Sequence, residues 1–414
     1  MCASYVIVGD GIAGSSAAET LREADPEADV TVITEEGEAL YNRILIKEFA
    51  KGKLPAAPVS IREPDWYADR DIDLRLNTVV TGVDTDAHEL STHEGDTYGY
   101  DRLLLATGGT PAQLPVDDSD ADGIHHFWTF EDARAIKAAA AEAETGVVVG
   151  AGLLGLDLAA ICGAQAVDAH YLMRGDAWWR YALSEDGAAI IHDALRDKGV
   201  TPVFGSGVDH FETDADGHVT AAVDPDGDRY AADFVGVAIG LDFNTEFIQD
   251  TPIECDNGIL VDEYMRTSVE DVYAAGDITR FHDVVLGERA QNGAWGSAKE
   301  QGSVAGRNMA TGGETEEFEW VSSYSITHFE FPFLSFGHPT LGDETVERTY
   351  DEGTWRRVTL KDGRVVGGVL IGDLAAQSAL KKLARRGVDV SDRTDRLLDE
   401  DVDVEAFTEA ATPE

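Results

Sequence analysis

The feature that most constrains this fold is a glycine-rich turn, G-x-G-x-x-G, which occurs twice in the 414 residues. Each copy follows an apolar segment, residues 5–8 or 147–149, and precedes residues that favour a helix. In such a turn the first glycine allows a tight bend, the second admits a pyrophosphate to the backbone, and the third lets the helix pack on the strand. Two dinucleotide-binding units are therefore predicted. Their glycines are Gly9, Gly11 and Gly14, then Gly150, Gly152 and Gly155.

A ribose-binding carboxylate is expected about 20 residues after each turn, at the end of the next strand. After the first turn, the apolar segment 30–34 leads to Glu35, which we expect to bind the ribose, with its neighbour Glu36 as the alternative. After the second turn, residues 169–173 lead to Arg174 rather than to an acid. An arginine there suits a 2′-phosphate, which favours NADPH, although Arg174 can equally be a solvated turn residue.

The order of the expected elements indicates an α/β fold with two Rossmann-like dinucleotide-binding domains and a small α+β C-terminal domain. A proline-containing linker at 111–115 separates the two glycine turns, and the composition changes after Val321, where aromatic residues and alternating strands follow. Helices are expected at 291–309 and 374–386, and a hairpin of strands 355–360 and 364–371 is expected around an Asp362-Gly363 turn. The expected domains are 1–114 with 242–320 for the first nucleotide, 115–241 for the second, 321–398 for the α+β domain, and an acidic tail at 399–414.

The charge of the chain limits its partners. Lysine and arginine total 32 against 79 aspartates and glutamates, so the formal net charge is −47. Such a charge repels nucleic acid and anionic membranes, and neither is expected as a partner. Because the apolar fraction is an ordinary 43%, disorder does not explain the charge. Adaptation to molar salt, where screening acts within about 3 Å, is the preferred interpretation, and an unusually acidic mesophilic protein is the alternative.

The three cysteines, Cys2, Cys162 and Cys255, form no short-spaced pair. The sequence therefore predicts neither a disulfide framework nor a zinc site, and a reduced cytoplasmic setting is expected. No apolar run is long enough to span a bilayer, and the N-terminus begins with a strand rather than a signal peptide. His125 and His126 lack companion ligands at metal spacing, so no metal site is expected.

Taken in order, the motifs resemble the FAD-dependent pyridine nucleotide-disulfide oxidoreductase superfamily. Besides the two glycine turns, the matching segments are Tyr41-Asn42-Arg43, Ala106-Thr107-Gly108, Ala274-Ala275-Gly276-Asp277 and residues 365–373. The chain is most similar to members without a redox disulfide, namely rubredoxin and ferredoxin reductases and the FAD-binding part of NADH-dependent nitrite reductase. The resemblance spans residues 5 to about 390. It implies FAD in the discontinuous domain and NADH or NADPH, the electron donor, in the domain 115–241.

The resemblance also implies roles for individual residues. The first turn, with Ile12 and Ala13, would bind the FAD pyrophosphate, and the second, with Leu153 and Leu154, the nicotinamide nucleotide. Glu35 would bind the FAD ribose. The other residues that would contact FAD are Arg43, Lys47, Val80, Thr107, Gly108, Asp277 and Trp295. Those that would complete the NAD(P)H site are Arg174 and Gly240. The segment with Trp295, Glu300 and Gln301 is similar to the helix that faces the flavin ring in this superfamily.

Two positions depart from relatives in the superfamily. Disulfide-reducing members have a cysteine shortly after the tyrosine loop, where this chain has Ile44, so dithiol chemistry is not expected. Many ferredoxin reductases pair a lysine of this loop with a glutamate on the helix after the second turn. The corresponding positions here are Glu48 and Asp157, with Lys47 one residue away. A Lys47–Asp157 pair is therefore left open.

The resemblance implies that hydride passes from NAD(P)H to the flavin and that electrons then leave for a separate acceptor. This acceptor would be a small rubredoxin- or ferredoxin-like protein, or an iron–sulfur or sirohaem partner. Because the flavin carries the chemistry, no catalytic side chain is assigned, and Asp157, Lys47 and His328 are only candidates. A peroxide-forming oxidase and a non-catalytic nucleotide sensor are the alternatives, and a homodimer is left open.

Three groups of residues are ambiguous. The aromatic segment 329–336 can form a docking surface for the acceptor, but a domain core or a dimer contact is favoured. His328 and His338 lie near this segment in the sequence. For these histidines an ordinary structural role is favoured over a functional one, in which His328 would lie near the flavin as a proton source. Trp178 and Trp179 can either cover the nucleotide or pack in a core.

Overall fold

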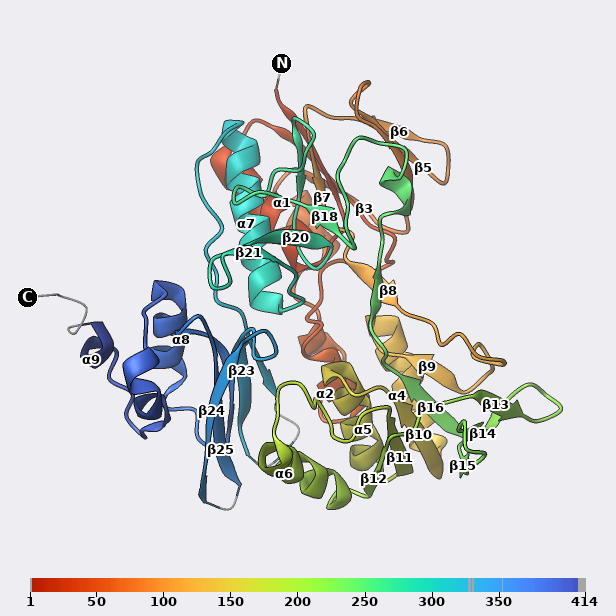
Figure 1. Ribbon diagram of the computed structural model, residues 1–414. Coiled ribbons are helices and arrows are strands. Elements are labelled where there is room, and N and C mark those ends of the chain that lie inside the picture. The colour runs from red at the N-terminus through yellow and green to blue at the C-terminus, as the bar shows by residue number, and fades with distance from the viewer. Residues whose placement is uncertain (1, 327–328, 330, 352, 409–414) are drawn as a thin grey trace, which may run out of the picture. The chain divides into compact units, whose positions relative to one another are not determined.

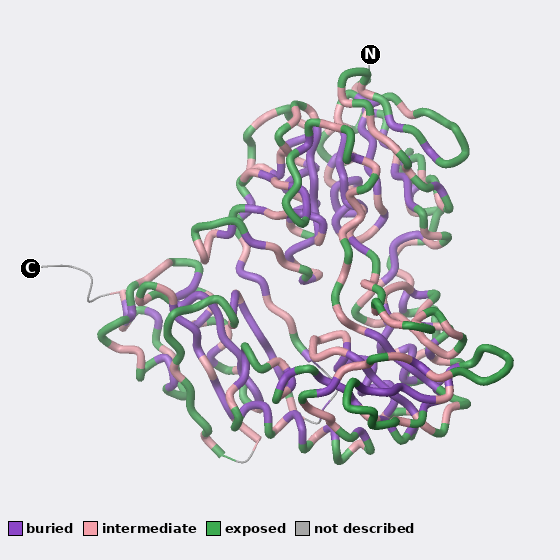
Figure 2. The backbone as a smooth tube through the Cα atoms, turned by 45° about the vertical axis from the view of Figure 1, so that its right-hand side comes forward, coloured by how far each residue is buried: buried purple, intermediate pink, exposed green. Residues whose placement is uncertain are grey.

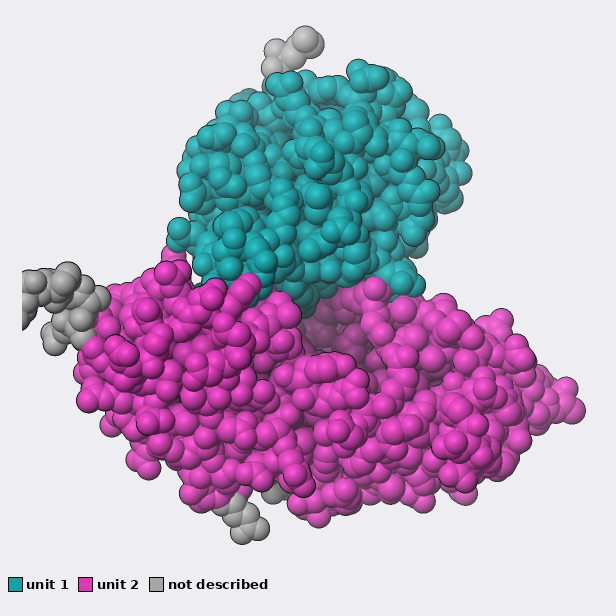
Figure 3. All heavy atoms as spheres, in the orientation of Figure 1, with its two compact units in different colours: residues 1–42, 60–110, 242–322 teal, residues 43–59, 111–241, 323–414 magenta. Residues whose placement is uncertain are grey.

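The computed structural model describes residues 2–326, 329, 331–351 and 353–408, which fold into two compact units. Unit 1 contains residues 1–42, 60–110 and 242–322, and unit 2 contains residues 43–59, 111–241 and 323–414 (Figure 3). The chain crosses between the units several times. Strands β8 (Gly109–Pro111) and β17 (Leu241–Phe243) pair with each other and contain two of these crossings.

Unit 1 is built on a parallel five-stranded sheet in the order β19-β7-β1-β2-β3; strands β3 and β7 of this sheet are labelled in Figure 1. Its strands are β1 (Ser4–Val8), β2 (Asp29–Ile33), β3 (Ile72–Arg75), β7 (Arg102–Leu105) and β19 (Val272–Ala274). Strand β1 is central because it pairs with both β2 and β7. Residues 5–8 are buried, as expected for a parallel sheet covered on both faces, and the sheets hold much of the buried core (Figure 2).

Helices α1 (Ile12–Ala24) and α7 (Trp295–Thr311) of unit 1 pack closely against each other. A Cβ added to Gly302 would lie 2.0 Å from the carbonyl oxygen of Ala13, so a larger residue would force the helices apart. This contact explains the small residues of α7. The other elements of unit 1 are α3 (Pro64–Ala68), β4 (Val80–Asp84), β5 (Glu89–Thr92), β6 (Thr97–Gly99), η2 (Glu246–Ile248), β18 (Ile259–Leu260), β20 (Thr279–Asp283) and β21 (Glu288–Ala290).

Unit 2 contains a second parallel five-stranded sheet, in the order β12-β11-β10-β16-β9. The strands are β9 (Ile124–His126), β10 (Thr145–Val149), β11 (Asp168–Met173), β12 (Val200–Phe204) and β16 (Phe234–Val237). The helices of this part are α2 (Ile46–Ala50), α4 (Phe130–Glu142), α5 (Leu153–Gln165) and α6 (Glu185–Arg196), with the short helix η1 (Ala57–Val59). A small antiparallel sheet consists of β13 (His210–Thr213), β14 (Val219–Val223) and β15 (Arg229–Ala231).

The C-terminal part of unit 2 is an antiparallel sheet in the order β22-β23-β26-β25-β24. Its strands are β22 (Ser323–Ile326), β23 (Phe333–Gly337), β24 (Glu344–Asp351), β25 (Thr354–Lys361) and β26 (Arg364–Ile371), followed by α8 (Gln377–Arg386), η3 (Ser391–Leu398) and α9 (Val404–Thr408). The buried Trp355 of β25 packs on α6, since a Cβ added to Gly187 would lie 2.9 Å from its ring. This contact helps to join the two sheets of unit 2.

The predicted α/β fold class is confirmed by these parallel sheets. Helix α7 begins at Trp295 and α8 at Gln377, each later than expected. Strand β24 and helix α6 were not predicted. The three-domain division stays a prediction, and the contacts place residues 43–59 in unit 2, whereas the expected first domain includes them. The expected tail contains α9 with buried Val404 and Phe407, and residues 409–414 lie outside the described part.

Candidate dinucleotide-binding sites

The first glycine turn connects β1 to α1 in unit 1. Gly9 has a φ of +106°, in a region that favours glycine, and a Cβ there would lie 2.2 Å from the carbonyl oxygen of Ala106. A Cβ on Gly14 would lie 1.9 Å from the carbonyl oxygen of Gly9, so this glycine lets α1 pack on the strand. A Cβ on Gly11, by contrast, would meet nothing within 4 Å. Gly11 therefore faces open space.

The second glycine turn connects β10 to α5 in unit 2 and repeats this geometry. Gly150 has a φ of +119°, and a Cβ there would lie 2.0 Å from the carbonyl oxygen of Ala238. A Cβ on Gly155 would lie 2.4 Å from the carbonyl oxygen of Gly150. A Cβ on Gly152 would again meet nothing within 4 Å. The two turns are alike position by position.

Both turns fit a pyrophosphate. Gly11 and Gly152 are the N-cap residues of α1 and α5, and neither helix has a side-chain hydrogen bond at its cap. The first N–H groups of a helix have no partner within the helix, and the helix dipole favours negative charge at this end. Each turn thus combines backbone donors with open space that a Cβ would fill. Ile12 and Ala13 begin α1, and Leu153 and Leu154 begin α5.

Other residues predicted to bind FAD follow the carboxyl ends of strands in unit 1. Glu35 follows β2 and is exposed, Thr107 and Gly108 follow β7, and Asp277 follows β19. Because β2, β7 and β19 run parallel to β1 in the same sheet, all four residues come at the edge of the sheet that carries the first glycine turn. Ligands of open α/β sheets bind at this edge. The assignment of these residues to FAD stays a prediction.

A buried glutamine fixes the turn that carries Asp277. Gln301 of α7 is fully buried, and its Oε1 accepts hydrogen bonds from the backbone N–H of Gly276 and from Thr279 Oγ1, both at 2.8 Å. Gly276 immediately precedes Asp277, so α7 holds this turn in place. The remaining residues of unit 1 that are predicted to bind FAD are Trp295, the first residue of α7, and Val80, the first residue of β4.

A chain of buried polar side chains at the first turn was not predicted from the sequence. Asp10 is 7% exposed, and Tyr67 Oη donates to its two carboxylate oxygens at 2.6 and 2.9 Å. Tyr67 Oη also lies 2.8 Å from Ser15 Oγ, which accepts a hydrogen bond from Arg62 Nη1 at 2.7 Å. Burial raises the pKa of Asp10 to about 7, although the bond from Tyr67 lowers it. The feature of the sequence that could have indicated this chain is the acidic residue Asp10 within the glycine turn.

A tryptophan braces the second turn. The carbonyl oxygen of Gly152 accepts a hydrogen bond from Trp178 Nε1 at 3.3 Å. The backbone N–H of Trp178 donates to His192 Nε2 at 3.1 Å, and burial lowers the pKa of this histidine. Trp178 is fully buried, with its ring 6.0 Å from that of Phe333. The structure therefore shows the packing role for Trp178.

Two arginines flank Gly175 at the end of β11. Arg174 is exposed and begins the segment after the strand, as predicted. Arg180 is also exposed, and its Cδ lies 2.9 Å from the position of a Cβ on Gly175. Neither arginine forms an ion pair with another residue of the described ranges. Gly240, the other predicted NAD(P)H residue, has a φ of +125° and open space where a Cβ would lie.

Lys47 and Asp157, the pair left open by the sequence, lie together in unit 2. Lys47 Nζ of α2 is 3.6 Å from Asp157 Oδ1 of α5, and both side chains are 5% exposed. Tyr324 of β22 is hydrogen-bonded to Asp157, and burial together with this carboxylate raises the pKa of Tyr324. Arg43 Nη1 donates to the carbonyl oxygen of Trp128 at 2.8 Å. The roles of Arg43, Lys47 and Asp157 toward FAD stay predictions.

The ambiguous C-terminal residues lie largely in the core of unit 2. Within the segment 329–336, Phe333 and Phe336 are at most 1% exposed. His338 is buried as well, whereas His328 lies outside the described residues. The cysteines Cys2, Cys162 and Cys255 are free, and burial raises the pKa of Cys162 to about 12. Ile44 is 45% exposed.

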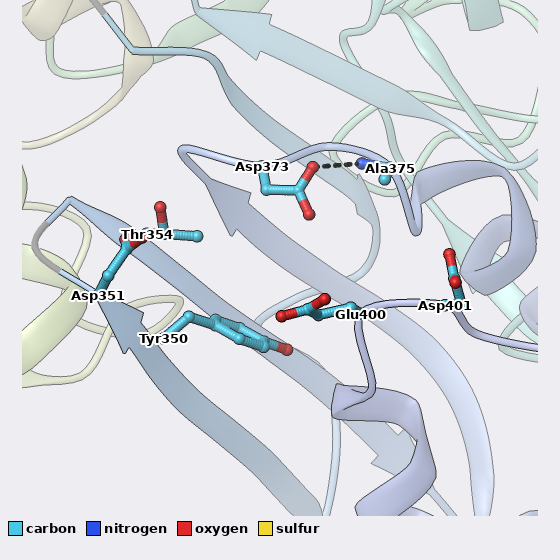
Figure 4. Close-up of a pocket in the computed structure, with 7 residues that line it drawn as sticks. All are labelled: Tyr350, Asp351, Thr354, Asp373, Ala375, Glu400 and Asp401. Carbon is cyan, nitrogen blue, oxygen red and sulfur yellow. Dashed lines mark hydrogen bonds between the residues drawn. The ribbon is translucent and has the colours of Figure 1, made fainter.

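A hollow of about 340 Å³ in the C-terminal part of unit 2 carries several carboxylates (Figure 4). It is lined by Tyr350, Asp351, Thr354, Asp373, Ala375, Glu400 and Asp401. Among the residues that the structure describes, no group of three histidines, cysteines or acids could hold a metal ion. None of the described helices has the length and apolar character to cross a membrane. The expectations of a high-salt, cytoplasmic protein stay predictions.

The two turns and their sheets define a protein that binds two dinucleotides. Residues 3–302 match the family described as pyridine nucleotide-disulphide oxidoreductase, and the chain belongs to this family. The superfamily predicted from the motifs is thereby confirmed. Its homologues bind FAD and use NADH or NADPH.

Two curated relatives and one solved structure illustrate the match. Nitrite reductase [NAD(P)H] of Bacillus subtilis is 28% identical over 392 residues, covering 94% of this chain and 48% of the relative. The chain therefore spans about half the length of that protein. Putidaredoxin reductase CamA of Pseudomonas putida is 33% identical over 287 residues, 67% of each chain. A covalent putidaredoxin reductase–putidaredoxin complex matches with a TM-score of 0.91 and 26% identity, covering 100% of this chain and 99% of that one.

Proposed function

We propose that the protein is an FAD-dependent reductase that takes hydride from NADPH or NADH and passes the electrons to a separate redox protein. The observation that carries this proposal is the duplicated turn, with open space at Gly11 and Gly152 beside uncapped helix N-termini. One dinucleotide site alone would suit many dehydrogenases. Two sites in one chain suit an enzyme that binds both a flavin and a nicotinamide dinucleotide.

FAD would occupy unit 1. The first turn would bind its pyrophosphate, Glu35 or Glu36 its ribose, and Asp277 and Thr107 the remainder from the same sheet edge. The chemistry that FAD would supply when bound is to accept a hydride and to release electrons one at a time. The protein would bind and orient both dinucleotides, and no side chain need act as an acid or base.

The nicotinamide nucleotide would occupy unit 2, and we favour NADPH. Met173 ends β11 where an NAD-selective site carries an acid. Arg174 comes next, and Arg180 lies beside Gly175. A 2′-phosphate is a dianion that arginine binds through charge-assisted hydrogen bonds. These residues support NADPH over NADH in a chain whose acidic surface otherwise repels phosphate.

The acceptor would be a small one-electron carrier. Homologues work with small redox partners such as putidaredoxin and nitrite reductase subunits. The balanced reaction is NADPH plus two oxidised carriers giving NADP⁺, a proton and two reduced carriers. Because position 44 is isoleucine, a cysteine-based route is not supported there. The competing oxidase would convert NADPH, a proton and dioxygen into NADP⁺ and hydrogen peroxide.

The test is an anaerobic titration of the FAD-loaded protein in molar salt, first with NADH and then with NADPH, followed by admission of air. We expect NADPH to bleach the flavin absorbance at lower concentration and the colour to return slowly in air. Failure of both nucleotides to bleach the flavin would contradict the reductase and favour a nucleotide sensor. Immediate return of the colour with stoichiometric peroxide would favour the oxidase.

A further inference from the structure

The first glycine turn contains a carboxyl group whose chemistry conflicts with the phosphate expected beside it. Asp10 lies inside the turn next to Gly11, and its side chain is buried and hydrogen-bonded to Tyr67. A carboxylate and a pyrophosphate within one turn repel each other, and burial removes most of the water that would screen them. A neutral carboxyl group at this position would avoid this repulsion.

The hydrogen bonds around Asp10 suit both of its charge states. A guanidinium can only donate, so Ser15 Oγ accepts from Arg62. When Asp10 is ionised, Tyr67 donates to it and Ser15 can donate to Tyr67. When Asp10 is protonated, it can donate to Tyr67, and Tyr67 can then donate to Ser15. The buried chain can therefore reverse its direction without breaking a contact.

The charged and polar groups around Asp10 come from several elements. Tyr67 lies on α3, and Arg62 precedes that helix and pairs with Glu19 of α1. Beyond β2, the backbone N–H of Leu40 donates to Asp10, and the nearby charge of Glu36 favours its protonated form. Arg62 and the donated bonds favour the ionised form, whereas burial opposes it most strongly. These opposing effects leave the ionised and protonated forms of Asp10 close in free energy near neutral pH.

We propose that Asp10 takes up a proton when FAD binds, so that the affinity of unit 1 for FAD falls as the pH rises. The inference rests on the proposed binding of FAD at the first turn. The added phosphate charges favour the protonated form of Asp10 further. By linkage, a complex that binds more protons than its free components is weakened by raising the pH. The weakening would begin near pH 7, where burial places the pKa of free Asp10.

The test is calorimetric titration of apoprotein with FAD between about pH 6 and pH 9, in buffers of different ionisation enthalpy. We expect uptake of up to one proton per FAD, and a dissociation constant that rises by up to about tenfold per pH unit above neutrality. Asp10→Asn should remove both effects. Tyr67→Phe should move them to higher pH, because the bond from Tyr67 lowers the pKa of Asp10.

Tyr100→Phe is the matched control. Its hydroxyl is buried in unit 1 and has no hydrogen-bond partner in the described part of the chain, so this variant should titrate like the parent. Equal proton uptake in the parent and Asp10→Asn would overturn the inference, as would FAD binding by the parent without proton uptake. If Asp10→Asn does not fold, Tyr67→Phe tests the inference instead. Proton uptake that does not move to higher pH in Tyr67→Phe would then overturn it. Absence of FAD binding at every pH would instead contradict the proposed function.

Discussion

Lys47 and Asp157 form a buried ion pair in unit 2, with Nζ and Oδ1 3.6 Å apart and both side chains 5% exposed. The two residues lie on α2 and α5, far apart in the sequence. Neither charge has much access to water, so each depends on the other and on nearby polar groups. Asp157 is also hydrogen-bonded to Tyr324. The pair therefore ties the segment 43–59 to the second nucleotide-binding sheet.

The first prediction concerns the stability of this pair. Lys47→Met should lower the free energy of unfolding by about 3 kcal/mol, because it leaves the Asp157 charge buried without its cation. Urea denaturation in molar salt measures the change. Lys53→Met is the control, since Lys53 is 56% exposed and its 3.8 Å pair with Glu48 should be worth less than about 1 kcal/mol. Equal effects of the two substitutions would show that the buried pair is not structurally important.

The sequence predicted the parts of the site that depend on local spacing. The glycine turns were recognisable because one pattern fixes a bend, an open position and a close packing contact within six residues. The strand at 364–371 was likewise predicted from its apolar run and the Asp362-Gly363 turn. These features need only the chain within a few residues of each position.

The sequence could not predict contacts that the tertiary fold creates. Tyr67 reaches Asp10 because α3 packs beside the turn, and nothing in the segment 64–68 indicates which residue its hydroxyl will meet. The association of residues 43–59 with unit 2 depends on side-chain packing between distant helices. Strand β24 was missed because most of its residues are polar or charged and exposed, so it lacks an alternating apolar pattern.

The second prediction separates binding from folding at the first turn. Gly11→Ala should leave the stability of the apoprotein within about 0.5 kcal/mol, because the added Cβ meets nothing within 4 Å and the φ of −71° suits alanine. It should weaken FAD binding at least about tenfold by filling the phosphate space. Thermal unfolding of the apoprotein and FAD titration measure the two effects.

Gly14→Ala is the comparison for that experiment. Its Cβ would lie 1.9 Å from the carbonyl oxygen of Gly9, so the helix must move away from the strand. A loss of stability of about 1–3 kcal/mol or more is expected even without FAD. If Gly11→Ala binds FAD as tightly as the parent does, the pyrophosphate does not approach this glycine.

The third prediction tests the two arginines beside Gly175. Arg174→Ser and Arg180→Ser should each weaken NADPH binding by roughly 10- to 100-fold, as expected for the loss of a charge-assisted hydrogen bond worth about 1.5–3 kcal/mol. NADH binding should change by less than about threefold. Dissociation constants from anaerobic titrations of both nucleotides give the ratio. Arg196→Ser is the control, because Arg196 pairs with Asp193 on the exposed surface of α6. Equal losses for both nucleotides would refute recognition of the 2′-phosphate.

The fourth prediction concerns the response of unit 2 to acid. His192 Nε2 accepts a hydrogen bond from the Trp178 N–H, so this contact requires the unprotonated ring. Burial, with a smaller contribution from Arg196, lowers the pKa of His192 below its usual value near 6.5. Between the two pKa values the unfolded chain binds a proton that the folded chain does not, so stability falls as the pH decreases. Below pH 6.5, the slope of the unfolding free energy against pH should be smaller in His192→Gln than in the parent. The difference should correspond to less than one proton bound on unfolding.

Denaturation at about pH 7, 6 and 5 in constant salt measures this slope. Carboxylates also contribute to acid sensitivity, but they contribute equally to the parent and to His192→Gln, so the difference in slope isolates the histidine. Because Trp178 Nε1 also donates to Gly152, the same acidification should loosen the second glycine turn. Binding of NADPH to the parent should then weaken below about pH 6 more than binding to His192→Gln does. Parallel pH profiles for the two proteins would show that His192 does not support the turn.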